Sequence, residues 1–166
     1  RVAQVEGRVR GERLHAIQRE RDRSDELLLN ILPATVAQEL KDQGYTEARH
    51  FEQVTVLFSD FRGFTSMAEK LSAAELIAEI YHCFKAFDTI MDRYAIEKIK
   101  TIGDAYMAAA GLPDPGRSGA VEMVQAALEM QQFIAERHRE RSASGKPAFQ
   151  MRIGLHSGPV VAGVVG

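Results

Sequence analysis

FSDFRGFT, at residues 58–65, is the stretch that decides the fold, and its meaning is clearest beside IKTIGDAYM at residues 99–107. The first stretch ends an apolar, β-branched run and turns through Gly63 toward a helical segment, whereas the second has the pattern of a hairpin with a Gly-Asp pair at its tip. Each stretch contributes one aspartate, Asp60 or Asp104, at the end of a β-type segment. Two carboxylates on adjacent strands supply the oxygen ligands that a pair of Mg²⁺ ions on a triphosphate requires.

The turn that follows Asp60 predicts an anion site beside these carboxylates. Ser66 and Glu69 have capping-box spacing, which predicts a helix start there and leaves the backbone N–H groups of residues 63–65 free to bind phosphate. The alternative for each aspartate alone is structural, because Asp60 could cap a turn and Gly-Asp pairs are common in hairpins. The two aspartates together favour the metal-site interpretation.

The order of hydrophobic patterns predicts an α+β fold. Strand patterns cover residues 54–58, 96–102, 105–110 and 149–155, and apolar residues at helical spacing run from Leu76 to Tyr94 and from Ala120 to Ile134. The resulting βαββαβ order is that of a ferredoxin-like sheet with helices on one face. Residues 137–146 are interpreted as a solvated helix end and loop, and Cys83 as a half-buried packing residue.

Composition sets the remaining limits. The chain has 166 residues, of which 45% are hydrophobic and 27% charged, and this is enough for one compact domain plus an appendage. Its 21 basic and 23 acidic residues give no electrostatic reason to expect a nucleic-acid partner. No run approaches the roughly 18 apolar residues of a membrane span, so the segment itself is expected to be cytoplasmic, although a larger parent protein could be membrane-tethered.

Three stretches carry a family resemblance: FSDFRGFT, IKTIGDAYMAAAGLP and MRIGLHSGPVVAGVVG. They resemble successive signatures of class III nucleotidyl cyclases, which convert ATP or GTP to the 3′,5′-cyclic monophosphate. The resemblance covers residues 51–166. It implies that two Mg²⁺ (or Mn²⁺) ions are held in each active site by Asp60, Asp104 and the carbonyl of Phe61.

The same resemblance assigns the residues that contact the nucleotide. It implies that the backbone amides of Gly63, Phe64 and Thr65 hold phosphates, and that Arg152 faces the triphosphate. Lys100 stands where guanylyl members have a glutamate. A lysine can only donate hydrogen bonds, which suits the N1 acceptor of adenine and predicts ATP as the substrate. The alternative for Lys100 is a solvated strand lysine.

The N-terminal part has a different pattern. Leu14, Ile17, Leu28 and Ile31 fit the a and d positions of a heptad repeat, which predicts a parallel dimeric coiled coil, with a solvated single helix as the alternative. We therefore predict three parts: a signalling helix at residues 1–32, a transducer or linker at 33–50, and the N-terminal part of a catalytic domain at 51–166. The resemblance implies an upstream sensor and a homodimer, formed through the coiled coil and the catalytic domain, in which Lys100 of one subunit contacts the base of a nucleotide whose metals bind the other.

The resemblance also implies residues that this sequence does not contain. The family's transition-state asparagine and arginine would follow residue 166, and the apolar run at residues 160–165 needs a partner strand, so a C-terminally truncated domain is predicted. The leading interpretation is an adenylate cyclase. The alternatives are a guanylate cyclase and a non-catalytic regulatory cyclase-like module. Lys100 favours the adenylate cyclase over the guanylate cyclase, and the paired aspartates favour it over the non-catalytic module.

Overall fold

The computed structural model describes Gln18, Glu20, Arg23 and residues 34–163, and the chain divides into two units, Arg1–Thr46 and Glu47–Gly166. In the first unit, the three isolated residues are helical and exposed. Helix α2 (Ala34–Gln43) ends at Gly44, which has φ 77°. Apart from the three isolated residues, the predicted coiled coil of residues 1–32 lies outside the described residues and stays a prediction.

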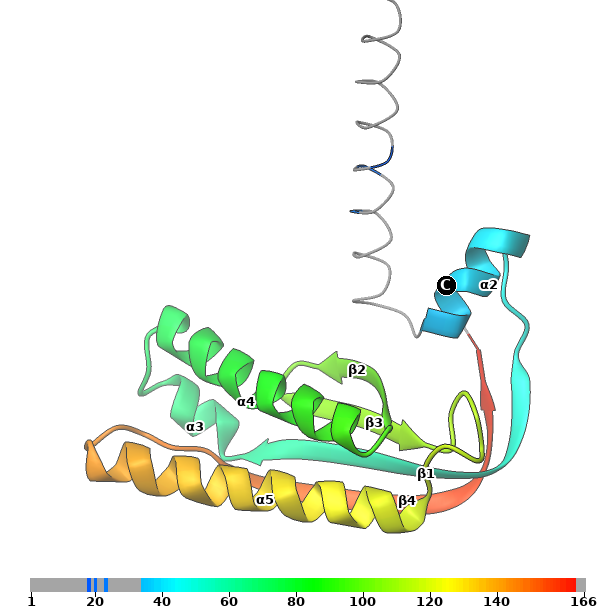
Figure 1. Ribbon diagram of the computed structural model, residues 1–166. Helices are drawn as coiled ribbons and strands as arrows, with labels where there is room; N and C mark the ends of the chain where they lie inside the picture. The colour runs from blue at the N-terminus through cyan, green and yellow to red at the C-terminus, as the bar shows by residue number, and fades with distance from the viewer. Residues whose placement is uncertain (1–17, 19, 21–22, 24–33, 164–166) are drawn as a thin grey trace, which may run out of the picture. The chain divides into compact units, whose positions relative to one another are not determined.

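The second unit is a four-stranded antiparallel sheet covered on one face by helices (Figure 1). The strand order β2-β3-β1-β4 confirms the predicted ferredoxin-like βαββαβ fold, to which the short helix α3 is an addition. The elements are β1 (Arg49–Arg62), α3 (Phe64–Ala68), α4 (Ala73–Arg93), β2 (Glu97–Ile102), β3 (Ala105–Ala110), α5 (Ala120–Ala143) and β4 (Gln150–Ala162).

The main hydrophobic core lies between the sheet and helices α4 and α5. Leu57 and Phe61 of β1, Phe87 of α4, Tyr106 of β3 and Met130 of α5 are each at most 2% exposed and belong to one cluster. Removing this apolar surface from water is the dominant favourable term in folding. Because strand side chains alternate between faces, the residues next to these in β1 and β3 point to the opposite side of the sheet, which we call the open face.

Helix α4 begins with a capping box two turns later than the one predicted. Ser72 is its N-cap, and Ser72 and Glu75 satisfy one another's backbone N–H groups at 3.3 and 3.0 Å. The prediction of a capping box at Ser66 and Glu69 is wrong, because α3 already begins at Phe64. Gly63 adopts φ 69° and ψ 26°, a left-handed conformation that turns the chain into the helix earlier than the side-chain pattern indicated.

Strands β1 and β4 are longer than their apolar cores predicted. They have 14 and 13 residues and pair from Arg49 opposite Ala162 to Arg62 opposite Gln150, with a bulge after Phe51. The start of the run expected to lack a partner is therefore paired within the chain, since Val160 lies opposite Phe51. Residues 164–166 of that run lie outside the described residues.

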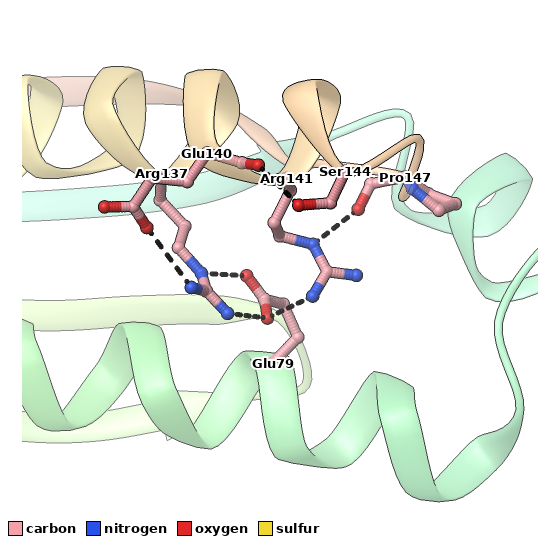
Figure 2. Close-up of polar contacts among 6 residues, drawn as sticks. All are labelled: Glu79, Arg137, Glu140, Arg141, Ser144 and Pro147. Atoms are coloured by element: carbon pink, nitrogen blue, oxygen red, sulfur yellow. Dashed lines mark hydrogen bonds and ion pairs between the residues drawn. The ribbon is translucent and has the colours of Figure 1, made fainter.

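Residues 137–146 form a helix end and loop, as predicted, because α5 ends at Ala143, but two of the arginines in this stretch are not solvated. Arg137 and Arg141 both reach Glu79 of α4, which is only 4% exposed (Figure 2). Arg137 donates Nε to Oε1 at 2.9 Å and Nη2 to Oε2 at 2.8 Å, and Arg141 donates Nη1 to Oε2 at 2.8 Å. Arg141 also donates Nε to the Pro147 carbonyl at 2.6 Å, so the cluster fixes the loop before β4.

The free thiol of Cys83 is fully buried in α4, beyond the half-buried position expected. Burial raises the pKa of this thiol to about 12, so Cys83 acts as a small apolar core residue. None of the helices in the described part of the chain is long and apolar enough to cross a membrane.

Candidate active site

Asp60 and Asp104 meet at one end of the open face. Asp60 lies near the end of β1, and Asp104 lies in the β2–β3 turn, where Gly103 adopts φ 61°. Burial is the main cause that raises the pKa of Asp104. A hydrogen bond with Asp60 and the negative charge of that carboxylate act in the same direction, whereas backbone N–H groups of Asp104 and Phe61 act against it. The predicted approach of the two carboxylates is therefore present, with the Phe61 backbone beside them.

The donor set at this position suits a hard divalent cation. Mg²⁺ is usually held by one or two carboxylates, and phosphate oxygens of the substrate complete its coordination. Within residues 34–163, together with the three isolated helical residues, no group of three or more His, Cys, Asp or Glu side chains gathers as a self-sufficient metal site. The candidate ligands among the described residues are thus the Asp60 and Asp104 carboxylates and the Phe61 carbonyl. So few protein ligands suit a metal ion that binds together with a nucleotide.

The turn at Gly63 sits directly beyond Asp60. The first N–H groups of a helix lack intrahelical acceptors, and in α3 the first such bond is from the Met67 N–H to the Gly63 carbonyl at 3.1 Å. The ring of Phe64 stacks on Phe149 with centroids 6.0 Å apart, which anchors this residue in the core and leaves its backbone at the turn. The amides of residues 63–65 are therefore close in sequence to Asp60 and are not used by the first bond of the helix.

Arg152 is the direct cross-strand partner of Asp60 between β4 and β1. Its Nε donates to Asp60 Oδ2 at 2.8 Å, and its Nη2 donates to the same oxygen. The arginine side chain is 74% exposed and the aspartate 36%, so solvent screens the pair strongly. The structure thus brings Arg152 to the carboxylate site, in contact with Asp60 itself.

Lys100 lies on the open face because of an irregularity in β2. The register shifts between Lys98, which is opposite Ala108, and Lys100, which is opposite Met107, so Ile99 is the extra residue of a bulge. Without the bulge, Lys98 and Lys100 would lie on the same face of the sheet, because residues two apart in a strand share a face. Lys100 is exposed, and among the described residues it lies on the same face as Asp60 without forming a hydrogen bond or ion pair with it.

The other lysine, Lys98, belongs to a network that the sequence did not reveal. Its Nζ donates to Asp88 of α4 at 2.8 Å, and the Tyr106 hydroxyl donates to the same carboxylate at 2.7 Å. Burial and this hydrogen bond raise the pKa of Tyr106, which keeps the phenol a donor. A cavity of about 400 Å³ beside the network is lined by residues of α4, β2 and the β2–β3 turn, including Tyr81 and Gly103. Only the bulge at Ile99 separates the roles of the two lysines.

Across the open face, the register aligns Lys100, Met107, Phe58 and Gly154 in one row, adjacent to the row that contains Asp60 and Arg152. Phe58 is 46% exposed despite its size. An exposed aromatic ring beside cations and carboxylates is the kind of surface that can hold a base and its phosphates. Neither Phe58 nor Met107 was among the predicted site residues, although their period-two alternation with core residues is a signal that could have identified them.

Comparisons with known proteins identify the family of the chain. The family model for the adenylate and guanylate cyclase catalytic domain matches residues 46–166. Human guanylyl cyclase C is 40% identical over 156 residues, which are 93% of this chain and 14% of that protein. An adenylate cyclase of Mycobacterium bovis is 39% identical over 148 residues, which are 89% of this chain and 32% of that protein. The chain thus spans a small part of these curated relatives.

A solved structure extends the comparison to the fold. The catalytic core of a rhodopsin-guanylyl cyclase with converted specificity, in complex with ATPαS, is 37% identical and superposes with a TM-score of 0.65, covering 72% of this chain and 64% of that one. These findings confirm the resemblance first seen in the three sequence stretches. The chain belongs to the adenylate and guanylate cyclase catalytic-domain family, the class III nucleotidyl cyclases.

Proposed function

We propose that the protein is an adenylate cyclase that converts ATP to 3′,5′-cyclic AMP and pyrophosphate in signal transduction. The observation that carries the proposal is the meeting of Asp60 and Asp104 on the open face, on which Lys100 also lies. Cyclase chemistry of the adenylate or guanylate type follows from the family. The choice of ATP over GTP rests on Lys100.

This family uses divalent metal ions, and two Mg²⁺ or Mn²⁺ ions would be held by the Asp60 and Asp104 carboxylates and the Phe61 carbonyl. When bound, they supply the Lewis acidity that lowers the pKa of the ribose 3′-hydroxyl and neutralises triphosphate charge. The chain's own groups then bind and orient the nucleotide. Amides of residues 63–65 hold phosphate oxygens, and Arg152 contributes a positive charge to the same anion.

The reaction is an in-line displacement within one nucleotide. The ribose 3′-oxygen forms a bond to the α-phosphorus, its proton passes to water, and the bond from the α-phosphorus to the pyrophosphate oxygen breaks, so that pyrophosphate leaves. Little covalent chemistry is required of the protein, so positioning and charge stabilisation dominate. Asp60, Asp104, Arg152 and the Gly63 turn supply this stabilisation from one end of the open face.

Base selection is the part of the proposal that separates it from its main alternative. Human guanylyl cyclase C, at 40% identity, favours a guanylate cyclase. The resemblance of the motif around Lys100 to adenylyl members favours ATP, because a lysine donates to adenine N1 and has no acceptor for the N1 and N2 donors of guanine. We further propose a homodimer in which Lys100 contacts a nucleotide whose metals bind the partner subunit, with residues 1–32 transmitting a signal from an upstream sensor.

The test uses the full-length protein and measures cyclic AMP and cyclic GMP formation with Mg²⁺ and with Mn²⁺. Asp60→Asn and Asp104→Asn are each expected to lower kcat by at least about a hundredfold, since loss of one catalytic metal removes several kcal/mol of transition-state stabilisation. Asp92→Asn, an exposed aspartate on α4, is the matched control and should retain wild-type rates. Activity above about a tenth of wild type in both site variants would remove the two-metal proposal, and absence of cyclase activity in the wild type would favour the non-catalytic alternative.

A further inference from the structure

The contact between Arg152 and Asp60 is unusual in how it uses the carboxylate. Both donors, Nε and Nη2, converge on the single oxygen Oδ2. Arg152 therefore occupies an oxygen of a carboxylate that the proposed function assigns to a metal ion. A guanidinium and a divalent cation repel one another, so both cannot hold that oxygen at full strength.

The ion pair between Arg152 and Asp60 can break at little cost in stability. Arg152 is 74% exposed and Asp60 36%, and ion pairs at such positions contribute little net stability. The backbone of β4 is held independently, because Gln131 of α5 donates to the Met151 carbonyl at 3.2 Å. Breaking the contact therefore requires movement of one long side chain and no rearrangement of the strand.

Room for that movement lies on the same face of β4. Gly154 is the next residue on the open face after Arg152, and it lies opposite Phe58 of β1. A Cβ atom placed at Gly154 would have no atom within 4 Å, so the space above this glycine is open. The Arg152 side chain therefore has open space beside it along the strand, away from Asp60.

From these observations we infer that Arg152 is an exchangeable counterion: it neutralises Asp60 when no metal is bound, and a metal ion that takes Asp60 releases its guanidinium toward the nucleotide phosphates. This inference rests on the proposed function, because it takes Asp60 as a metal ligand. Positive charge is thereby kept at Asp60 in both states. Release of the guanidinium also couples metal binding to phosphate binding.

The exchange predicts that one substitution strengthens the binding of the metal ion alone and weakens the binding of the metal–nucleotide complex. In Arg152→Ala, Mn²⁺ alone should bind about twofold to fivefold more tightly, because no competing cation has to be displaced. The Mn²⁺ complex of 2′,3′-dideoxy-ATP, which lacks the attacking hydroxyl, should bind at least about tenfold more weakly, because a charged hydrogen bond to phosphate is lost. Free Mn²⁺ is counted by electron paramagnetic resonance in titrations of the full-length protein, with circular dichroism to verify folding.

Two further variants make the outcomes distinguishable. Arg62→Ala removes the same charge two residues along β1 from Asp60, at an exposed arginine opposite Gln150, and should leave the affinity for Mn²⁺ alone nearer to wild type than Arg152→Ala does. Arg152→Lys, which keeps the charge but not the paired donors, should fall between wild type and Arg152→Ala. Unchanged or weaker binding of Mn²⁺ alone by Arg152→Ala, while Asp60→Asn abolishes it, would overturn the exchange and leave the metal site intact. Unchanged Mn²⁺ binding by Asp60→Asn would overturn the proposed metal site itself.

Discussion

Removal of Glu79 should destabilise the catalytic unit far more than removal of a surface glutamate. In wild type, this buried carboxylate accepts hydrogen bonds from Arg137 and Arg141, whose side chains are only 27% and 12% exposed (Figure 2). Glu79→Ala would leave the largely buried Arg141 guanidinium without its counterion, whereas Arg137 would keep only its 3.4 Å ion pair with the exposed Glu140. Breaking a buried ion pair by removing one partner typically costs about 3–5 kcal/mol. Because Arg137 can partly turn to solvent, we expect a loss of about 3 kcal/mol in the free energy of unfolding.

Glu129 provides the matched control, since it also joins α4 to α5 through an arginine. Its contact with Arg93 is 2.6 Å long and it also accepts from the Tyr94 hydroxyl at 2.6 Å, but the Glu129 and Arg93 side chains are 33% and 59% exposed, so Glu129→Ala should cost about 1–2 kcal/mol. Urea unfolding of both variants, followed by far-ultraviolet circular dichroism, gives the comparison. Equal losses for the two variants would refute the argument that burial of the Glu79 cluster sets its energetic importance.

The pH dependence gives an independent test of the same cluster. Burial alone would raise the pKa of Glu79, but the hydrogen bond from Arg137 and the charges of Arg141 and Arg137 outweigh it and lower the pKa below its ordinary value of 4.5. The stabilisation is therefore fully present above pH 4.5 and lost as the pH falls through the lowered value. The stability difference between wild type and Glu79→Ala should shrink over that acidic range, and a constant difference would contradict the linkage.

Three further predictions concern the site and its regulation. Lys100→Glu should lower kcat/KM for ATP and permit some GTP turnover, because an acceptor replaces a donor at the base, and an unchanged ratio of the two kcat/KM values would make Lys100 a surface lysine. Gly63→Ala should lose about 1 kcal/mol of stability at its left-handed φ of 69° and raise KM for ATP, whereas Gly44→Ala, at φ 77°, should lose similar stability with KM unchanged. Inserting one residue within residues 1–30 should change regulated activity more than inserting seven, because one residue rotates a helix by about 100° and seven restore the heptad. Equal effects of the two insertions would identify the segment as a passive tether.

The fold and the paired aspartates could be predicted because their signals are local. The Gly-Asp pair between two β-type runs is visible within a few residues, and so are the apolar stripes of α4 and α5. The capping box was misplaced because the left-handed backbone of Gly63, which starts α3, leaves no side-chain pattern. Pairings at long range were invisible for a different reason.

Glu79 and Arg137 are 58 residues apart, and Asp60 and Arg152 are 92 apart, so neither pair has a signature in local sequence. Arginines near a helix end are usually solvated, which made the usual interpretation the wrong one for Arg137 and Arg141. The direct contact of Arg152 with Asp60 could be found only once the register of β1 and β4 was known.

The bulge at Ile99 determines which changes in chain length β2 can accept. Lys98 and Lys100 face opposite sides only because Ile99 has no partner of its own in β3. A relative lacking this residue would return to regular alternation with both lysines still opposite their present partners, but would lose the packing of Ile99 near Val54 and Ala109. A relative with one more residue before Lys100 would have to widen the bulge or turn that lysine to the helix side. Members of the family should therefore lack the residue at Ile99 more often than they carry an extra residue beside it.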